Sequence, residues 1–295
     1  MKKFLSVLMA GAMLFGVLTL AGCGDTTTDT GEDTTTTEDT TTTAEFTTVT
    51  EGVLTMSTNA AFPPYEMTDD SGNIVGIDAE IAAAIAEKLG LELQIDDMDF
   101  DGALAAPQSG KSDIVMAGVT VNEERQLVLD FSNTYANGVQ KVIVAEGSDI
   151  TMENLGEQQI GTQKGTTGNI LTTDEFGEDH VIAYDDAIAA VQALNNGQID
   201  CVVIDSAVAD NLVEANPGLT TLDTDYANEE YAIGVAKGNT ALLDAINTAL
   251  QELIDDGTVQ SIIDKYIPSD GAEADTAGAT DEAGATDGAE ADTAA

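Results

Sequence analysis

Apolar residues in the first part of the chain's central region alternate between the spacing of strands and that of helices. Val53–Thr58 is a short apolar run typical of a buried strand. Apolar residues at helical spacing follow, namely Ile77, Ile81, Ala84, Ile85 and Leu89. The pattern then predicts a strand at Leu91–Ile95, a short helix from about Asp101, and an apolar strand at Ile114–Ala117. This β-α-β-α-β order predicts parallel strands with helices on both faces of a sheet.

The second part of this region repeats the alternation. Strands are predicted at Val139–Ala145, Gln159–Thr162, Val181–Tyr184 and Cys201–Ile204, and helices at Asp185–Asn196, Ser206–Ala215, Thr240–Asp256 and Val259–Tyr266. No long linker separates the two halves. We therefore expect an α/β protein of two lobes, each a mostly parallel sheet flanked by helices, joined by short extended crossings near Ala136–Gln140 and Ala227–Ile233. A single larger α/β domain is the alternative.

The amino terminus has the order of a secretory signal peptide. Lys2 and Lys3 precede the apolar run Phe4–Leu20, and small residues then lead to Cys23. Leu-Ala-Gly-Cys resembles the lipobox of bacterial lipoproteins, in which the cysteine thiol carries lipid. We expect residues 1–22 to be the signal peptide and Cys23 to be a lipid anchor. A membrane-spanning helix is the alternative, because the run is close to the spanning minimum of about 17 residues.

Two low-complexity tracts flank the region with core-forming residues. Residues 23–47 are rich in Thr, Asp and Glu, and residues 269–295 repeat Gly, Ala, Asp, Glu and Thr, so we expect a disordered tether and a disordered acidic tail. The formal net charge is −45, and the tracts hold only 7 and 8 of the 54 acidic residues. The central region is therefore strongly acidic, which excludes nucleic acid and anionic membrane surfaces as partners.

The chain contains a single arginine, Arg125. It follows the predicted strand Ile114–Ala117 and the segment Gly118 to Glu124, and ligands in open parallel sheets bind beyond the carboxyl ends of strands. A guanidinium binds a carboxylate through two parallel hydrogen bonds, and Thr120 offers a hydroxyl nearby. A surface ion pair with one of the many carboxylates is the alternative for Arg125.

Two further strand ends carry polar groups, and one cysteine lies in the predicted core. The loop Gln163 to Gly168 is suited to an anion held by helix amides, although it lacks the spacing of a nucleotide-binding loop. Asp205 directly follows Ile204, where a ligand contact and the N-cap of the next helix are both open and compatible with each other. Cys201 lies in an apolar strand and has no partner in the mature chain, so an inert thiol is expected there.

From Val53 to about Ile267 the chain resembles the amino-acid-type solute-binding proteins of ABC importers, the family of the glutamine and lysine/arginine/ornithine binding proteins. The motifs that carry the resemblance are Thr58-Asn59-Ala60-Ala61-Phe62-Pro63-Pro64-Tyr65-Glu66, Gly76-Ile77-Asp78, Asp99-Phe100-Asp101, Ala117-Gly118-Val119-Thr120 to Glu124-Arg125, Asp130-Phe131-Ser132 and Gln163 to Thr167. The resemblance implies a type II periplasmic-binding-protein fold, with lobe 1 at residues 48–138 and 232–268 and lobe 2 at residues 139–231. Pro107 departs from the family pattern, so the helix from Asp101 is expected to end early.

The resemblance also implies the roles of the site residues. Arg125, Thr120, the Gly118 backbone and Thr167 would hold the α-carboxylate of an amino acid, and Asp205 its α-ammonium. Phe62 and Phe100 would enclose the ligand side chain, Asn59 and Gln163 would set specificity, and Ala117 would be a further substrate-binding residue. Because Asn59 and Gln163 are amides, we expect a polar, uncharged amino acid such as glutamine, asparagine or cystine.

A free amino acid and the permease subunits of an ABC importer are therefore the expected partners of a monomer anchored at the outer face of the bacterial cytoplasmic membrane. We expect no enzymatic activity, no cofactor and no metal. The alternatives are a catalytic relative of the fold, such as a cyclohexadienyl dehydratase or a cell-wall lytic enzyme, and a ligand-sensing receptor domain. An enzyme needs a positioned acid or base, and the one histidine, His180, lies in a polar, turn-like stretch.

Overall fold

The computed structural model describes residues 46–223 and 225–267. The predicted signal peptide, Cys23, most of the tether and the acidic tail lie outside these residues. Phe46, at the predicted end of the tether, packs against the main hydrophobic core. The helices and strands of the described residues belong to one unit of the chain, Thr43–Ala295.

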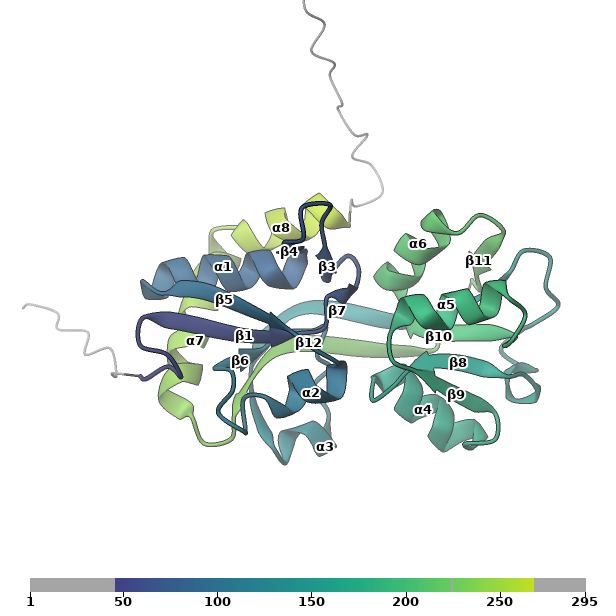
Figure 1. The fold of residues 1–295 in the computed structure, drawn as a ribbon, viewed down its shortest axis with the longest axis horizontal. Coiled ribbons are helices and arrows are strands. Elements are labelled where there is room, and N and C mark those ends of the chain that lie inside the picture. Colours follow the sequence, from purple (N-terminus) through teal and green to yellow (C-terminus); the bar gives the residue numbers. More distant parts are fainter. Residues whose placement is uncertain (1–45, 224, 268–295) are drawn as a thin grey trace, which may run out of the picture. The chain divides into compact units, whose positions relative to one another are not determined.

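Lobe 1 contains the elements built around the first strand (Figure 1). They are β1 (Val53–Thr58), β2 (Ala61–Phe62), β3 (Glu66–Thr68), β4 (Ile74–Val75), α1 (Ile77–Leu89), β5 (Glu92–Asp97), α2 (Phe100–Ala105), β6 (Ile114–Val115), α3 (Glu123–Gln126), α7 (Thr240–Asp255) and α8 (Thr258–Tyr266). The strands β5, β1 and β6 pair in parallel, as the β-α-β-α-β pattern predicts. A small antiparallel sheet, β2-β3-β4, lies beside them.

Lobe 2 contains the elements between residues 155 and 221. They are a 3₁₀ turn (Leu155–Glu157), β8 (Ile160–Gln163), α4 (Thr167–Phe176), β9 (Val181–Tyr184), α5 (Ala187–Asn195), β10 (Cys201–Asp205), α6 (Ser206–Ala215) and β11 (Leu219–Thr221). The strands β10, β8 and β9 again pair in parallel. Cys201 is fully buried in this core, and burial raises the pKa of its thiol to about 12, which keeps it unreactive.

Two long strands run through both lobes. They are β7 (Leu129–Ala145) and β12 (Ala227–Ala236), which pair antiparallel with each other. The main sheet therefore has the order β5-β1-β6-β12-β7-β10-β8-β9, with β11 paired to β7. Both predicted crossings lie in this ribbon, where Ala227 to Tyr231 pair with Gln140 to Ala136. The sequence prediction placed the start of β7 at Val139, ten residues too late, because the polar residues between 130 and 137 mask the apolar pattern.

Local sequence accounts for the ends of the helices that hold the site. The helix α1 begins after Gly76, whose φ of +132° and close approach to the Tyr65 carbonyl exclude a side chain. Gly90 ends the same helix in the left-handed conformation. Asp99 caps α2 by accepting a hydrogen bond from the Gly102 amide, and the helix stops at Ala105, two residues before Pro107, as predicted.

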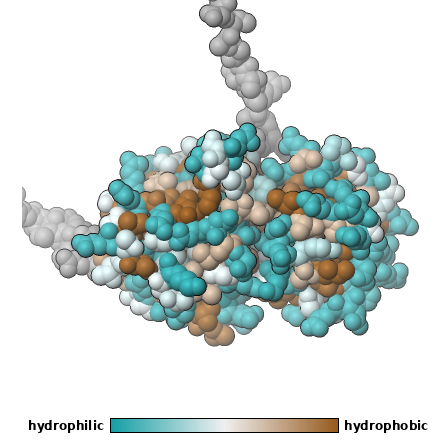
Figure 2. All heavy atoms as spheres, in the orientation of Figure 1, coloured by the Kyte–Doolittle hydropathy of each residue, from teal (hydrophilic) through white to brown (hydrophobic). Residues whose placement is uncertain are grey.

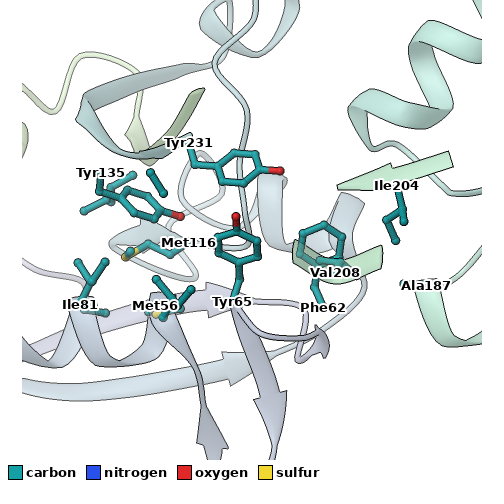
Figure 3. Close-up of a cluster of buried hydrophobic side chains, with 14 of the residues drawn as sticks. Met56, Phe62, Tyr65, Ile81, Met116, Tyr135, Ala187, Ile204, Val208 and Tyr231 are labelled. Carbon is teal, nitrogen blue, oxygen red and sulfur yellow. The ribbon is translucent and has the colours of Figure 1, made fainter. Parts of the chain in front are cut away.

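Hydrophobic cores occupy both faces of the sheet. The largest core joins residues of the two lobes, and Figure 3 shows part of it, with Tyr65 pointing toward Tyr231, Phe62 beside Tyr65 and Ile204 beyond. Hydrophilic side chains cover much of the visible surface (Figure 2). Within the described residues, no helix combines the length and apolar character needed to cross a membrane.

Candidate binding site

A cavity of about 10 Å³ lies where the ends of several strands meet the first turns of α2 and α4. Nine of the ten predicted ligand-contact residues line it: Asn59, Phe62, Phe100, Ala117, Gly118, Thr120, Arg125, Gln163 and Thr167. The cavity is narrow because side chains of both lobes meet across it. The tenth predicted residue, Asp205, lies behind Tyr231 and is not part of the lining. The structure therefore brings the predicted residues of the two lobes together.

Arg125 is buried at the wall of this cavity, with only 6% of its surface exposed. Asn122 caps the short helix α3 and accepts a hydrogen bond from the Arg125 amide, which fixes the start of the side chain. Arg125 Nη1 donates to the Thr120 carbonyl at 2.8 Å, and Arg125 Nη2 donates across the cavity to the Gly165 carbonyl at 3.1 Å. The guanidinium lies 5.3 Å from the centre of the Phe100 ring. Arg125 is therefore not a surface ion pair.

Burial is the main influence on the pKa of Arg125. Burial lowers the pKa of the Arg125 guanidinium, and nearby acidic groups, of which Glu229 is the strongest, oppose this shift. Arginine stays protonated in proteins, so the cavity contains one fixed positive charge. A carboxylate that enters the cavity would meet this charge in surroundings of low dielectric constant.

Gly118 is positioned by a carboxylate beneath the cavity. Its amide donates to Asp78 Oδ2 at 2.9 Å, so this N–H is already engaged within the protein. Its φ is +54°, and a Cβ at this position would lie 2.9 Å from the Phe62 ring. The close neighbour that requires a glycine here is therefore the aromatic side chain of Phe62.

Glu66 and Asp78 form a buried carboxyl pair next to the Gly118 amide. Neither side chain is exposed to solvent. Burial, and then the charge of Asp78, raises the pKa of Glu66 well above its usual range. Burial also raises the pKa of Asp78 to about 6, against the hydrogen bond from the Gly118 amide, which lowers it. The physical consequence is a protonated Glu66 beside Asp78, whose Oδ2 in turn holds the backbone at Gly118.

Two side-chain hydrogen bonds connect the lobes across the cavity. Gln163 Nε2 donates to Asn59 Oδ1 at 2.8 Å, and Asn59 Nδ2 donates to the Met98 carbonyl at 2.8 Å. Thr167 Oγ1 donates to Thr120 Oγ1, also at 2.8 Å. The oxygen Oε1 of Gln163 is buried with no hydrogen-bond partner among the described residues. The two predicted specificity residues thus contact each other and retain hydrogen-bonding capacity.

Asp205 is the N-cap of α6, as one of its two interpretations predicts. Its Oδ1 accepts hydrogen bonds from the amides of Ala207 at 2.8 Å and Val208 at 3.1 Å. Its Oδ2 accepts from the Tyr231 hydroxyl at 2.9 Å. The side chain has no exposed surface, and burial raises its pKa to about 7 against the hydrogen bonds that lower it, with the nearby Glu229 adding to the rise.

Five lining residues were not assigned by the sequence: Glu66, Gln140, Thr166, Glu229 and Tyr231. Glu66 stands in one of the motifs that carry the family resemblance, but the motif alone indicates no role for it. Glu229 and Tyr231 lie two residues apart in β12, so both face the same side of the strand. Alternation within the predicted crossing Ala227–Ile233 is the signal that could have identified this pair. Within the described residues, no group of metal-binding side chains is arranged to hold an ion.

Comparison with known proteins identifies the family. A sequence model of the bacterial extracellular solute-binding proteins, family 3, matches residues 54–269. The chain belongs to this family. Its relatives are extracellular binding proteins of transport systems rather than enzymes, and the family places the chain outside the cytoplasm.

Individual relatives extend over most of the chain. A probable histidine-binding protein of Neisseria gonorrhoeae is 29% identical, over 93% of this chain and 98% of the relative. The L-cystine-binding protein TcyJ of Escherichia coli strain K12 is 30% identical, over 74% of this chain and 84% of the relative. The solved structure of an ancestral arginine-binding protein bound to glutamine is 39% identical with a TM-score of 0.71, over 75% of this chain and all of that protein. Such structures confirm the two-lobed, type II periplasmic-binding fold predicted from the sequence.

Proposed function

We propose that this protein captures a free amino acid between its two lobes and presents it to the permease of an ABC importer. The observation that carries the proposal is the buried guanidinium of Arg125, which lies in one cavity with buried carboxyl groups and three aromatic rings. A zwitterion removed from water needs an opposite charge for each of its ends, and this cavity supplies both. The relatives bind histidine, cystine, arginine or glutamine, by their names.

Each part of the ligand has a place in this scheme. Arg125, Thr120 and Thr167 bind the α-carboxylate, and Asp205, whose Oδ2 now accepts from the Tyr231 hydroxyl at the cavity wall, binds the α-ammonium. Phe62 and Phe100 enclose the side chain, whose end lies between Asn59 and Gln163. Because the Gly118 amide is held by Asp78, Gly118 contributes by its lack of a side chain and not by this N–H.

Closure of the lobes couples binding to transport. The contacts from Gln163 to Asn59, from Thr167 to Thr120 and from Arg125 to Gly165 all join lobe 2 to lobe 1. Contacts that form only in the closed arrangement shift the population toward it, and an amino acid in the cavity adds further contacts of this kind. Residues 48–138 and 232–268 move against residues 139–231, with the paired strands β7 and β12 as the hinge. The permease then recognises the closed arrangement.

The side chain of the ligand is polar and uncharged in this proposal. The cavity presents two amides at this end, and Gln163 Oε1 has no hydrogen-bond partner among the described residues. The nearby charged pair, Lys164 and Asp101, is exposed and self-neutralising, with Nζ and Oδ2 2.7 Å apart. Asn59→Asp would add a carboxylate here and should shift preference toward arginine and lysine. Tighter wild-type binding of arginine or lysine than of glutamine would refute the selectivity but leave the zwitterion site in place.

A thermal-shift screen tests the function itself. The protein is melted with each of the twenty amino acids, cystine and ornithine, because a ligand that binds only the folded state raises the melting temperature. A rise with at least one amino acid is expected, and the bound molecule should be recovered chemically unchanged after denaturation. No rise with any of them, or turnover of the bound amino acid, would overturn the proposal. Lipid attachment at Cys23 and a monomeric state complete the proposed picture.

A further inference from the structure

One phenol hydroxyl, that of Tyr231, faces two buried carboxyl groups. It lies 2.9 Å from Asp205 Oδ2 and 3.1 Å from Glu229 Oε2. A tyrosine hydroxyl has a single hydrogen, so it can donate to only one of these oxygens at a time. Burial raises the pKa of Tyr231 well above its usual range, with Asp205 and Glu229 adding to the rise, so the hydroxyl keeps this hydrogen. One carboxyl oxygen is therefore left without a donor from Tyr231.

Glu229 is the member of this pair that reaches the cavity. It is 5% exposed and lines the cavity together with Arg125 and Thr120, whereas Asp205 does not. Its Oε1 accepts a hydrogen bond from the Thr120 hydroxyl at 2.6 Å, and its Oε2 accepts from Gln140 Nε2 at 2.5 Å. In this arrangement the Thr120 hydrogen points to Glu229 and not into the cavity.

The charges around this pair do not balance without a further cation or proton. Arg125 on α3 is the one cationic group of the cavity lining, against Asp205 at the start of α6 and Glu229 on β12. Other titratable groups packed nearby are Tyr65, Glu66 and Asp78 of lobe 1, all acidic or neutral. A ligand carboxylate would pair with Arg125. Two buried carboxyl groups, Asp205 and Glu229, would then remain to interact with one α-ammonium.

We infer that Glu229 is a second carboxylate of the ammonium subsite and acts with Asp205 on either side of the Tyr231 hydroxyl. An ammonium group carries three hydrogens, enough to donate to Glu229, to Asp205 and to one further acceptor. When it donates to Glu229, it replaces the Thr120 hydroxyl there, and Thr120 then turns its hydrogen to the ligand carboxylate. The inference rests on the proposed function, because it specifies how that site binds the α-ammonium.

The neighbouring residue offers a matched control. Glu230 lies on the same strand but is exposed, so Glu230→Gln removes the same charge away from the cavity. The full chain is titrated by calorimetry with L-glutamine, L-arginine, L-histidine and L-cystine. The amino acid that binds best is then compared with its analogue in which hydrogen replaces the α-ammonium. Glu229→Gln should weaken amino-acid binding about 10- to 100-fold, the range for losing one charged hydrogen bond. Glu230→Gln should change it by less than about twofold.

The analogue separates an ammonium contact from a merely structural role. If Glu229 contacts the ammonium, Glu229→Gln should leave binding of the analogue nearly unchanged, so that the preference for the amino acid shrinks. An equal loss for both compounds, or no loss for either, would overturn the inference. If Glu229→Gln does not fold, Tyr231→Phe provides the same comparison, with the same expectation and the same contrary results. Failure of the wild type to bind any of the four amino acids would overturn the proposed function and this inference with it.

Discussion

Asp205 makes the stability of this protein depend on pH in a direction that a single substitution can reveal. The carboxyl group is buried, and its pKa is raised from 3.8 to about 7. In the unfolded chain it ionises near its usual pKa, so between pH 5 and 7 the folded protein holds a proton that the unfolded chain has lost. The slope of the unfolding free energy with pH is then negative, and stability falls as pH rises.

The magnitude follows from the two pKa values. One pH unit over which one proton is held only by the folded state is worth about 1.4 kcal/mol. From pH 5 to pH 8 the unfolded group is ionised throughout, and the folded group loses its proton near pH 7. Over about two of these pH units only the folded state holds the proton. Ionisation of Asp205 should therefore lower the free energy of unfolding by roughly 2–3 kcal/mol between pH 5 and pH 8.

Asp205→Asn isolates this contribution. Asparagine keeps a side-chain oxygen to cap α6 and an amide that faces Tyr231, but it does not titrate. Urea unfolding of both proteins, without added amino acid, gives the free energy at each pH. Relative to the wild type, the variant should become more stable by roughly 2–3 kcal/mol as the pH rises from 5 to 8.

The control is Asp244→Asn, which removes an exposed carboxylate from α7. Its free energy of unfolding should run parallel to that of the wild type across this pH range. The reasoning about Asp205 is refuted if the difference between wild type and Asp205→Asn stays constant from pH 5 to 8. It is also refuted if the difference changes in the opposite direction.

Three further substitutions probe other parts of the molecule. Arg125→Lys should weaken amino-acid binding by about 2–3 kcal/mol in calorimetry, because one ammonium cannot reproduce the paired, planar contact to a carboxylate; near-normal affinity would place the carboxylate site elsewhere. Gly76→Ala should lower the free energy of urea unfolding by about 3 kcal/mol or more, since its Cβ would lie 2.3 Å from the Tyr65 carbonyl oxygen and its φ is +132°; an unchanged midpoint would contradict this. Cys23→Ser should abolish lipid labelling and release the protein from membrane fractions, and undiminished labelling would remove the anchor argument.

The helices were predictable because their boundaries are marked in the local sequence. The helix α6 begins at Ser206 after the cap Asp205 and ends at Ala215 before Pro217, as predicted. The strands β7 and β12 were only partly predictable. They pass from one lobe to the other, so their surroundings change along their length and no single alternation of apolar residues runs through them. The helices α3 and α4 and the small sheet β2-β3-β4 were not given boundaries for a related reason: each is short or weakly apolar.

Only some of the site residues are marked in the sequence. A lone arginine in a chain of 54 acidic residues is conspicuous, so Arg125 could be singled out and lies where it was expected. Glu66 and Glu229 could not, because composition does not distinguish a buried carboxylate from an exposed one. Their burial is nevertheless the more informative fact. Water solvates exposed carboxylates at no cost, whereas each buried one needs a proton, a donor or a cation. Next to the cavity, a proton on Glu66 meets that need for Glu66, and the Gly118 amide donates to Asp78. At Asp205 and Glu229 the Tyr231 hydroxyl lies between two carboxyl groups, and an α-ammonium would supply the positive charge that balances them.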